Sequence, residues 1–192
     1  MEDTRNRILK AALESFSKHG YTGATTREIA RVSDVTEVTL FRHFPSKEKL
    51  FEEVVCKFLP SPEFGQFVTN AKNLEYRQSL ESIAHAFLVG LNQNEDLIHI
   101  LYMESQRHLE LMERVYVALV NNVEAMLADY FEELQRKNII RKFNSLVGAK
   151  MFLGIWMGIY EEEHLFAKDL VKVPNDEAVR DCVEIFARGT QI

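Results

Sequence analysis

Five side chains between residues 36 and 43 can donate or accept hydrogen bonds: Thr36, Glu37, Thr39, Arg42 and His43. Hydroxyl and guanidinium groups bind phosphate oxygens, whereas guanidinium and carboxylate groups can also bind the edges of bases. This mixture of residue types suits a nucleic-acid surface. It is equally compatible with a purely structural turn between two helices, so the surrounding elements decide what these side chains can reach.

Two short helices are predicted around this cluster. Thr25 is a good N-cap residue, and Glu28 three residues later completes a T-x-x-E capping box. Asp34 lies in the predicted turn, because Asp tolerates the left-handed backbone that a sharp turn between helices demands. Thr36 can cap the second helix, which Pro45 ends by pushing the residue before it out of helical geometry. Helix, tight turn and helix together form a helix-turn-helix, whose second helix enters the DNA major groove.

The ordered motifs from Thr4 to Phe51 resemble the DNA-binding domain of the TetR family of transcriptional repressors. The matching pieces are RILKAALESFSKHGY, then TTREIA, then the run V-T-x-x-T-L-F-R-H-F-P-S-K-E-K-L-F. The resemblance covers about a quarter of the chain, and the rest is similar to the family in length and helical pattern only.

The resemblance implies DNA contacts at the matching positions. Arg27 could pair with guanine, with a phosphate contact or charge balance by Glu28 as the alternatives. His43 and Lys47 match positions that usually hold phosphate, and Thr39 could contact phosphate or a thymine methyl group. The residues expected to contact DNA are Thr25, Thr26, Arg27, Thr36, Glu37, Thr39, Phe41, Arg42, His43 and Lys47.

Four positions depart from the family pattern. Phe41 stands where the family usually has a tyrosine that bonds phosphate, and Asp34 replaces the usual turn glycine. Glu37 and Val38 replace a common Lys-Gly or polar pair at the start of the recognition helix. Glu37 is repelled by phosphate but can accept from cytosine N4, or it could cap its own helix. The departures leave the predicted fold intact and the operator sequence open.

The remainder of the chain has helical periodicity, with no sustained two-residue alternation, so we predict an all-α fold of about nine helices. Prolines near residue 60 suggest a boundary between a DNA-binding domain of residues 1–58, which includes a connecting helix, and an effector-binding and dimerisation domain of residues 59–192. Residues 63–74 are expected to form a loop that includes at most one helical turn. Further helices are expected over residues 75–91, 96–108, 110–137 and 145–164, with a last one after Pro174.

Charge and composition limit the classes of function that fit this chain. The net charge is −6, but residues 1–50 carry 9 Lys+Arg and 7 Asp+Glu, whereas residues 51–192 carry 14 and 22. Only the N-terminal part is therefore electrostatically suited to phosphate. Cys56 and Cys182 lack metal-like spacing and are expected to be reduced thiols. No signal peptide or membrane span is visible, so we expect a cytoplasmic protein with no membrane partner.

Residues 146–160 are nearly hydrophobic all round, which requires burial on more than one side. Gly154 and Gly158 would let another backbone approach closely, either inside one subunit or between subunits. The family resemblance implies that the last two long helices pair with their copies in a homodimer. The residues assigned to this interface are Gly154, Gly158, Val179, Val183 and Phe186.

A small-molecule effector is also implied by the resemblance. Aromatic, Met and polar residues of the larger domain could line its pocket, although an ordinary core is the alternative for each of them. The candidates are Phe87, Tyr102, Met103, His108, Tyr116, Met126, Phe152, Trp156 and Tyr160.

Catalysis has little support in the sequence. Glu104 and His108 could share a metal, but no third ligand lies nearby in the sequence. No phosphate-binding glycine loop or hydrolase motif is present. We therefore expect no catalytic residue, metal or cofactor.

These features predict a TetR-like repressor that binds a palindromic double-stranded DNA operator as a homodimer and is released by a small apolar or aromatic ligand. The main alternative is a helix-turn-helix module that docks another protein and never binds DNA. A second alternative is an enzyme built on the larger domain.

Overall fold

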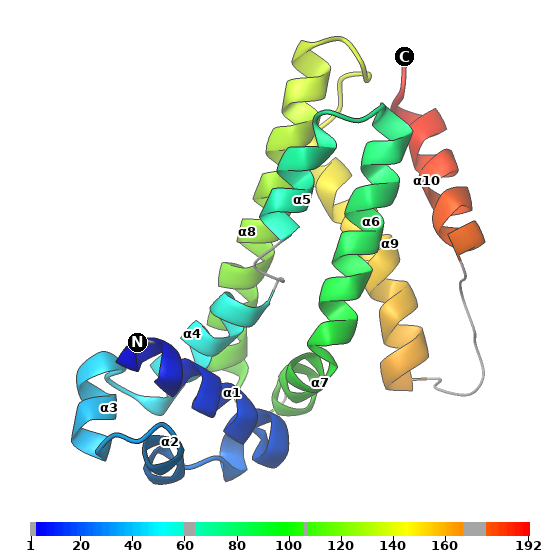
Figure 1. Ribbon diagram of the computed structural model, residues 1–192. Helices are drawn as coiled ribbons and strands as arrows, with labels where there is room; N and C mark the ends of the chain where they lie inside the picture. Colours follow the sequence, from blue (N-terminus) through cyan, green and yellow to red (C-terminus); the bar gives the residue numbers. More distant parts are fainter. Residues whose placement is uncertain (1–2, 60–63, 106, 167–175) are drawn as a thin grey trace. The chain divides into compact units, whose positions relative to one another are not determined.

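The computed structural model describes residues 3–59, 64–105, 107–166 and 176–192, and these residues fold into α-helices (Figure 1). They contain no β-strand, apart from an isolated bridge between Ile140 and Gln191, and the all-α prediction is confirmed. The helices are α1 Thr4–Gly23, α2 Thr26–Val32, α3 Glu37–His43, α4 Lys47–Phe58, α5 Phe64–Ala71, α6 Tyr76–Gln93, α7 Glu95–Glu104, α8 Leu109–Arg136, α9 Ser145–Glu161 and α10 Asp176–Thr190, with a π-helical turn, η1, over Glu162–Phe166.

The helices group into two compact units. The first comprises Met1–Leu59 and Asn94–Leu119, and the second comprises Pro60–Gln93 and Val120–Ile192. Residues 94–119, which hold α7 and the start of α8, therefore pack with the N-terminal helices. The functional division after residue 58 stays a prediction.

The first unit is built around α1, which packs against α2, α4 and α7. Its core includes Phe16 and Phe51, whose rings meet edge to face with centroids 4.9 Å apart. The helical path of α1 is broken at Gly20, where φ is 68° and ψ is 174°. Side chains clash in that conformation, so Gly is the natural residue there. The backbone of α1 thus turns at Gly20 before its last residues.

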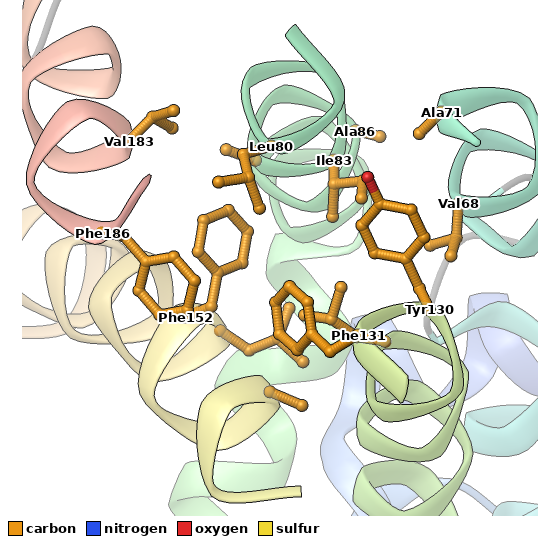
Figure 2. Close-up of a cluster of buried hydrophobic side chains, with 14 of the residues drawn as sticks. Val68, Ala71, Leu80, Ile83, Ala86, Tyr130, Phe131, Phe152, Val183 and Phe186 are labelled. Atoms are coloured by element: carbon orange, nitrogen blue, oxygen red, sulfur yellow. The ribbon is translucent and has the colours of Figure 1, made fainter. Parts of the chain in front are cut away.

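The second unit is held by an aromatic and aliphatic core between α6, α8, α9 and α10 (Figure 2). Phe152 lies at its centre, with its ring 5.0 Å from that of Phe186 and 5.7 Å from that of Trp156. Phe131 packs against Phe186 from α8, with centroids 5.8 Å apart. Leu80 enters the same cluster from α6 and is fully buried.

The prediction of a loop over residues 63–74 is wrong for most of that stretch. Residues 64–71 form α5, which buries Phe64, Val68 and Ala71 against α6 and its neighbours. Gly, Thr and Asn lower the helix propensity of this segment, so tertiary packing is what stabilises the helix.

A search of the described residues finds no helix that is both long and apolar enough to cross a bilayer.

Candidate nucleic-acid interface

The helix-turn-helix is formed by α2 and α3, and side-chain caps fix where both helices start. The Thr25 hydroxyl accepts from the Glu28 amide at 3.2 Å, and the Thr36 hydroxyl accepts from the Thr39 amide at 3.2 Å. Between them Asp34 has a φ of 53°, the left-handed conformation that the sequence predicts for this turn. Residues within or beside the two seven-residue helices therefore determine where each helix begins and how the chain turns between them.

Apolar side chains beneath α2 and α3 hold the motif against the rest of the first unit. Ile29, Leu40 and Phe44 are each fully buried. The Ser33 hydroxyl donates to the Ile29 carbonyl at 2.8 Å, which satisfies a polar group that would otherwise be buried unpaired at the turn. Since one face of each helix is buried, the opposite faces are free to meet a ligand.

Nine of the ten predicted DNA contacts lie on or directly before α2 and α3, and Lys47 lies at the start of α4. All ten are exposed or half-buried. The start of α2 is tied to the start of α3, because the Thr26 hydroxyl donates to the Glu37 carboxylate with the two oxygens 2.5 Å apart. Glu37 therefore accepts from the neighbouring helix. This hydrogen bond could not be foreseen from the sequence, because the two residues belong to different helices.

Arg27 is exposed, and its proposed balance by Glu28 is not what the structure shows. Glu28 instead accepts two hydrogen bonds from Arg31, at 2.9 and 2.7 Å. This pairing lowers the pKa of Glu28, with the Arg31 hydrogen bonds as the main cause. Among the described residues no ion pair involves Arg27, so its guanidinium is free to bind an anion or a base.

Lys47 lies at the start of α4 and contacts the end of α1. Its ammonium donates to the Thr22 carbonyl at 3.3 Å and lies 4.6 Å from the centre of the Tyr21 ring. Burial lowers the pKa of Lys47, against the opposing effect of Glu48 and Glu104. The cation is thus held beside the Gly20 turn, within the same unit as α2 and α3.

Phe41 and Val38 add an apolar component to this surface. Phe41 is 42% exposed and Val38 is 65% exposed, and both lie on α3. Sequence analysis notes Val38 only as a departure from the family pattern. Its exposure gives the recognition helix a second large apolar group three residues from Phe41.

The possible metal pair of Glu104 and His108 lies in the first unit. The His108 Nε2 is 3.7 Å from a Glu104 oxygen, and both side chains contact Thr22. Within the described residues no group of three metal-ligating side chains occurs. The pair is explained by hydrogen bonding to the end of α1.

The effector candidates divide between the two units. Tyr102, Met103, His108 and Tyr116 belong to the first unit, and Met103 and Tyr116 are 60% and 66% exposed. The second unit holds the other five, of which three are fully or almost fully buried and two lie nearer the surface. These five are Phe87, Met126, Phe152, Trp156 and Tyr160.

The Trp156 indole nitrogen is a polar group in this otherwise apolar interior. It is buried, and no hydrogen-bond partner for it occurs among the described residues. A buried donor without a partner costs free energy, which an acceptor atom on a bound molecule would recover.

The residues assigned to a dimer interface fall into two groups, one buried in the core and one at the surface. Val179, Val183 and Phe186 are buried in the core of their own chain, so they are not available to a second copy. Gly154 and Gly158 have open space where a side chain would be. Met151, on the same helix as these glycines, is 62% exposed, and Ile185 on α10 is 74% exposed.

Comparison with known proteins agrees with this geometry. Residues 8–54 match the family model described as bacterial regulatory proteins of the tetR family. The chain is 26% identical over 189 residues to the HTH-type transcriptional regulator YvkB of Bacillus subtilis, with 98% of each chain covered. It is 28% identical to the HTH-type transcriptional repressor KstR2 of Rhodococcus jostii over 61% of this chain and 57% of that one.

Solved structures share the fold. A TetR-family transcriptional regulator from Mesorhizobium loti superposes with a TM-score of 0.83 at 21% identity, covering 98% of this chain and 97% of that one. AibR, solved in complex with isovaleryl coenzyme A and operator DNA, gives a TM-score of 0.60 at 21% identity and covers 97% of each chain. The resemblance inferred from residues 4–51 is confirmed.

Proposed function

We propose that this chain, a DNA-binding transcriptional regulator of the TetR family, is a repressor that binds a palindromic operator as a homodimer and is released by a small ligand. The proposal is supported by the capped helices α2 and α3, whose outer faces carry Arg27, Arg42 and His43. Residues 1–50, which contain both helices, carry 9 Lys+Arg against 7 Asp+Glu, whereas residues 51–192 carry 14 against 22. A repressor acting on DNA belongs in the cytoplasm.

On the DNA, α3 would lie in the major groove and α2 would cross the backbone. Arg27 has no competing carboxylate among the described residues and would contact a base or a phosphate. Thr25 and His43 would bind phosphate, because their side chains are exposed beside the N-terminus of α2 and at the end of α3. Phe41 has no hydroxyl to offer phosphate, so its contribution is apolar. These contacts position the recognition helix, and base contacts by its first residues supply specificity.

Dimerisation would use the outer faces of α9 and α10. Met151 on α9 and Ile185 on α10 are exposed, and Gly154 and Gly158 leave room on α9 for the close approach of a second copy. Two copies related by a twofold axis would present two recognition helices to one palindrome. We therefore move the interface from the buried stripe of Val179, Val183 and Phe186 to the opposite face of α10.

Ile185→Lys tests this interface directly, because a charge at the centre of an apolar contact opposes association. Sedimentation should then show a monomer, and operator affinity should fall with it. Val89→Lys, which places the same charge on an exposed position of α6, is the control and should leave the dimer intact. If both variants stay dimeric, the interface lies elsewhere.

The ligand would bind in the second unit. Phe87 and Met126 supply apolar surface there, and the Trp156 indole nitrogen supplies a donor that lacks a partner among the described residues. A small apolar or aromatic molecule with one acceptor atom fits this composition. Solved structures of the same fold include the flavonoid-responsive regulator FrrA and AibR in complex with isovaleryl coenzyme A and operator DNA. By linkage, such a ligand and the operator would weaken each other's binding.

Selection of bound duplexes from a random-sequence pool, carried out at two salt concentrations, tests the function. A repressor of this kind should enrich a palindrome whose affinity falls steeply with salt, because phosphate contacts release counterions. Failure of the folded dimer to enrich any sequence would favour the alternative, in which the helix-turn-helix docks a protein partner.

A further inference from the structure

The first two residues of the recognition helix have unusual chemistry for a DNA-contacting surface. Glu37 is an anion in a motif that approaches phosphates, and Val38 is 65% exposed although it is apolar. The N-terminal residues of a recognition helix lie closest to the base edges. These two side chains are therefore placed where sequence is recognised, and what they can bind is limited by their chemistry.

Glu37 is held in one orientation. The Thr26 hydroxyl donates to its Oε1 at 2.5 Å, and Thr26 is itself fixed in the first turn of α2. The second carboxylate oxygen remains available as an acceptor. In the major groove only the cytosine N4 and adenine N6 amino groups donate, and a carboxylate typically accepts from cytosine N4. Guanine and thymine present acceptor oxygens at the same height, which repel a carboxylate.

Val38 can form no hydrogen bond through its side chain. The C5-methyl group of thymine is the only large apolar feature on a base edge in the major groove, so it is the natural partner of an isopropyl group there. Phe41 lies three residues further along α3 and is also exposed, so the two side chains form one apolar strip on the helix. The methyl group of a thymine can be buried against this strip.

We propose that Glu37 and Val38 determine operator choice by recognising pyrimidine edges, with Val38 packing on a thymine C5-methyl group and Glu37 accepting from a cytosine amino group. This inference rests on the proposed DNA-binding function. It goes further by naming the bases that the start of α3 selects in each half-site.

The test uses the sequence enriched from the random pool and replaces each thymine with deoxyuridine, which removes only the C5-methyl group. At one thymine of each half-site, removal of the methyl group should weaken operator binding by about fourfold per half-site. This is the effect expected for one buried methyl-sized group. In Val38→Ala the difference between thymine and uracil at that position should vanish. Val32→Ala removes an apolar side chain that is 48% exposed and lies on α2, outside α3, and it should leave the difference unchanged.

A second selection with Glu37→Gln tests the other half of the proposal. Glutamine binds adenine through N6 and N7, so the consensus base should change from cytosine to adenine at one position of each half-site. Circular dichroism of each variant confirms that the fold is retained.

The outcomes separate the inference from the proposed function. An enriched palindrome that the wild type binds equally well with thymine or uracil overturns the role of Val38, while DNA binding stands. An unchanged consensus with Glu37→Gln overturns the role of Glu37. Failure of the wild type to enrich any sequence overturns the proposed function, and the inference falls with it.

Discussion

The two units reach their structures by different physical means. In the first, threonine and serine caps begin α2, α3 and α4, and Asp34 supplies the turn, so signals within a few residues mark where these three helices begin. In the second, helix positions depend on rings from α8, α9 and α10 that meet only after folding. Local instructions suit a surface that must present fixed side chains to DNA. A core built from distant segments would be better suited to rearrangement if a ligand enters it, as proposed above.

The largest expected effect is on the non-local core. Phe152→Ala removes a fully buried ring that touches Trp156 and Phe186, and it should lower the free energy of unfolding by about 3–5 kcal/mol in denaturant titration. Phe67→Ala in α5 is the matched control, because that ring is 42% exposed and should contribute far less. Equal losses of unfolding free energy in the two variants would contradict the conclusion that the buried rings hold the second unit together.

Arg27→Ala should affect binding and leave folding unchanged. Its guanidinium is exposed, so its loss should weaken operator binding by about 1–3 kcal/mol, with relaxed specificity if a base is contacted. Arg31→Ala removes a neighbouring arginine that is already paired with Glu28, and its effect on affinity should be smaller. The two variants are compared by titration with the selected operator, and an Arg31 effect as large as that of Arg27 would reject the assignment.

Removal of a local cap should have an intermediate effect on stability. Thr36→Ala deletes the acceptor for the Thr39 amide and should lower the free energy of unfolding by about 1 kcal/mol. Thr36→Ser keeps the acceptor and should restore most of this loss. A neutral Thr36→Ala in thermal denaturation would mean that packing, and not the cap, sets the start of α3.

The smallest effect concerns a surface carboxylate of the second unit. Hydrogen bonds from Lys137 and Lys72 lower the pKa of Glu133 from 4.5 to about 2. Since the folded-state pKa is depressed, the stabilisation is complete above pH 4.5 and is lost as the pH falls toward 2. Glu133→Gln should therefore be less stable than the wild type near neutral pH, and denaturation curves should converge in acid. High salt should shrink the difference, because exposed pairs are screened.

The contrast between local signals and packing of distant segments explains which elements the sequence could predict. The Thr25 and Thr36 caps and the Asp34 turn follow from residue types, and the sequence predicts all three. α5 was missed, because its helix-forming residues are weak and Phe64 and Val68 gain stability only against α6. Periodicity identified an apolar stripe on α10 through Val183, but it could not tell whether the chain's own core or a second copy covers that stripe.

The candidate site shows the same limit. The residue types on α2 and α3 indicated DNA contacts, and the fold that carries them is confirmed, while the individual contacts stay predictions. The hydrogen bond from Thr26 to Glu37 joins two helices and is not encoded by any spacing within either one. Sequence therefore identified the surface, and only the structure gave the orientation of its acidic residue.

Trp156 is the single tryptophan of the chain and is completely buried in the second unit. Its fluorescence therefore reports the environment of one core, whereas the far-ultraviolet circular dichroism of the helices reports both units. If the two signals change at the same denaturant concentration, the units unfold together. If they separate, the spectroscopic midpoints distinguish the stability of the first unit from that of the second in one experiment, without any label.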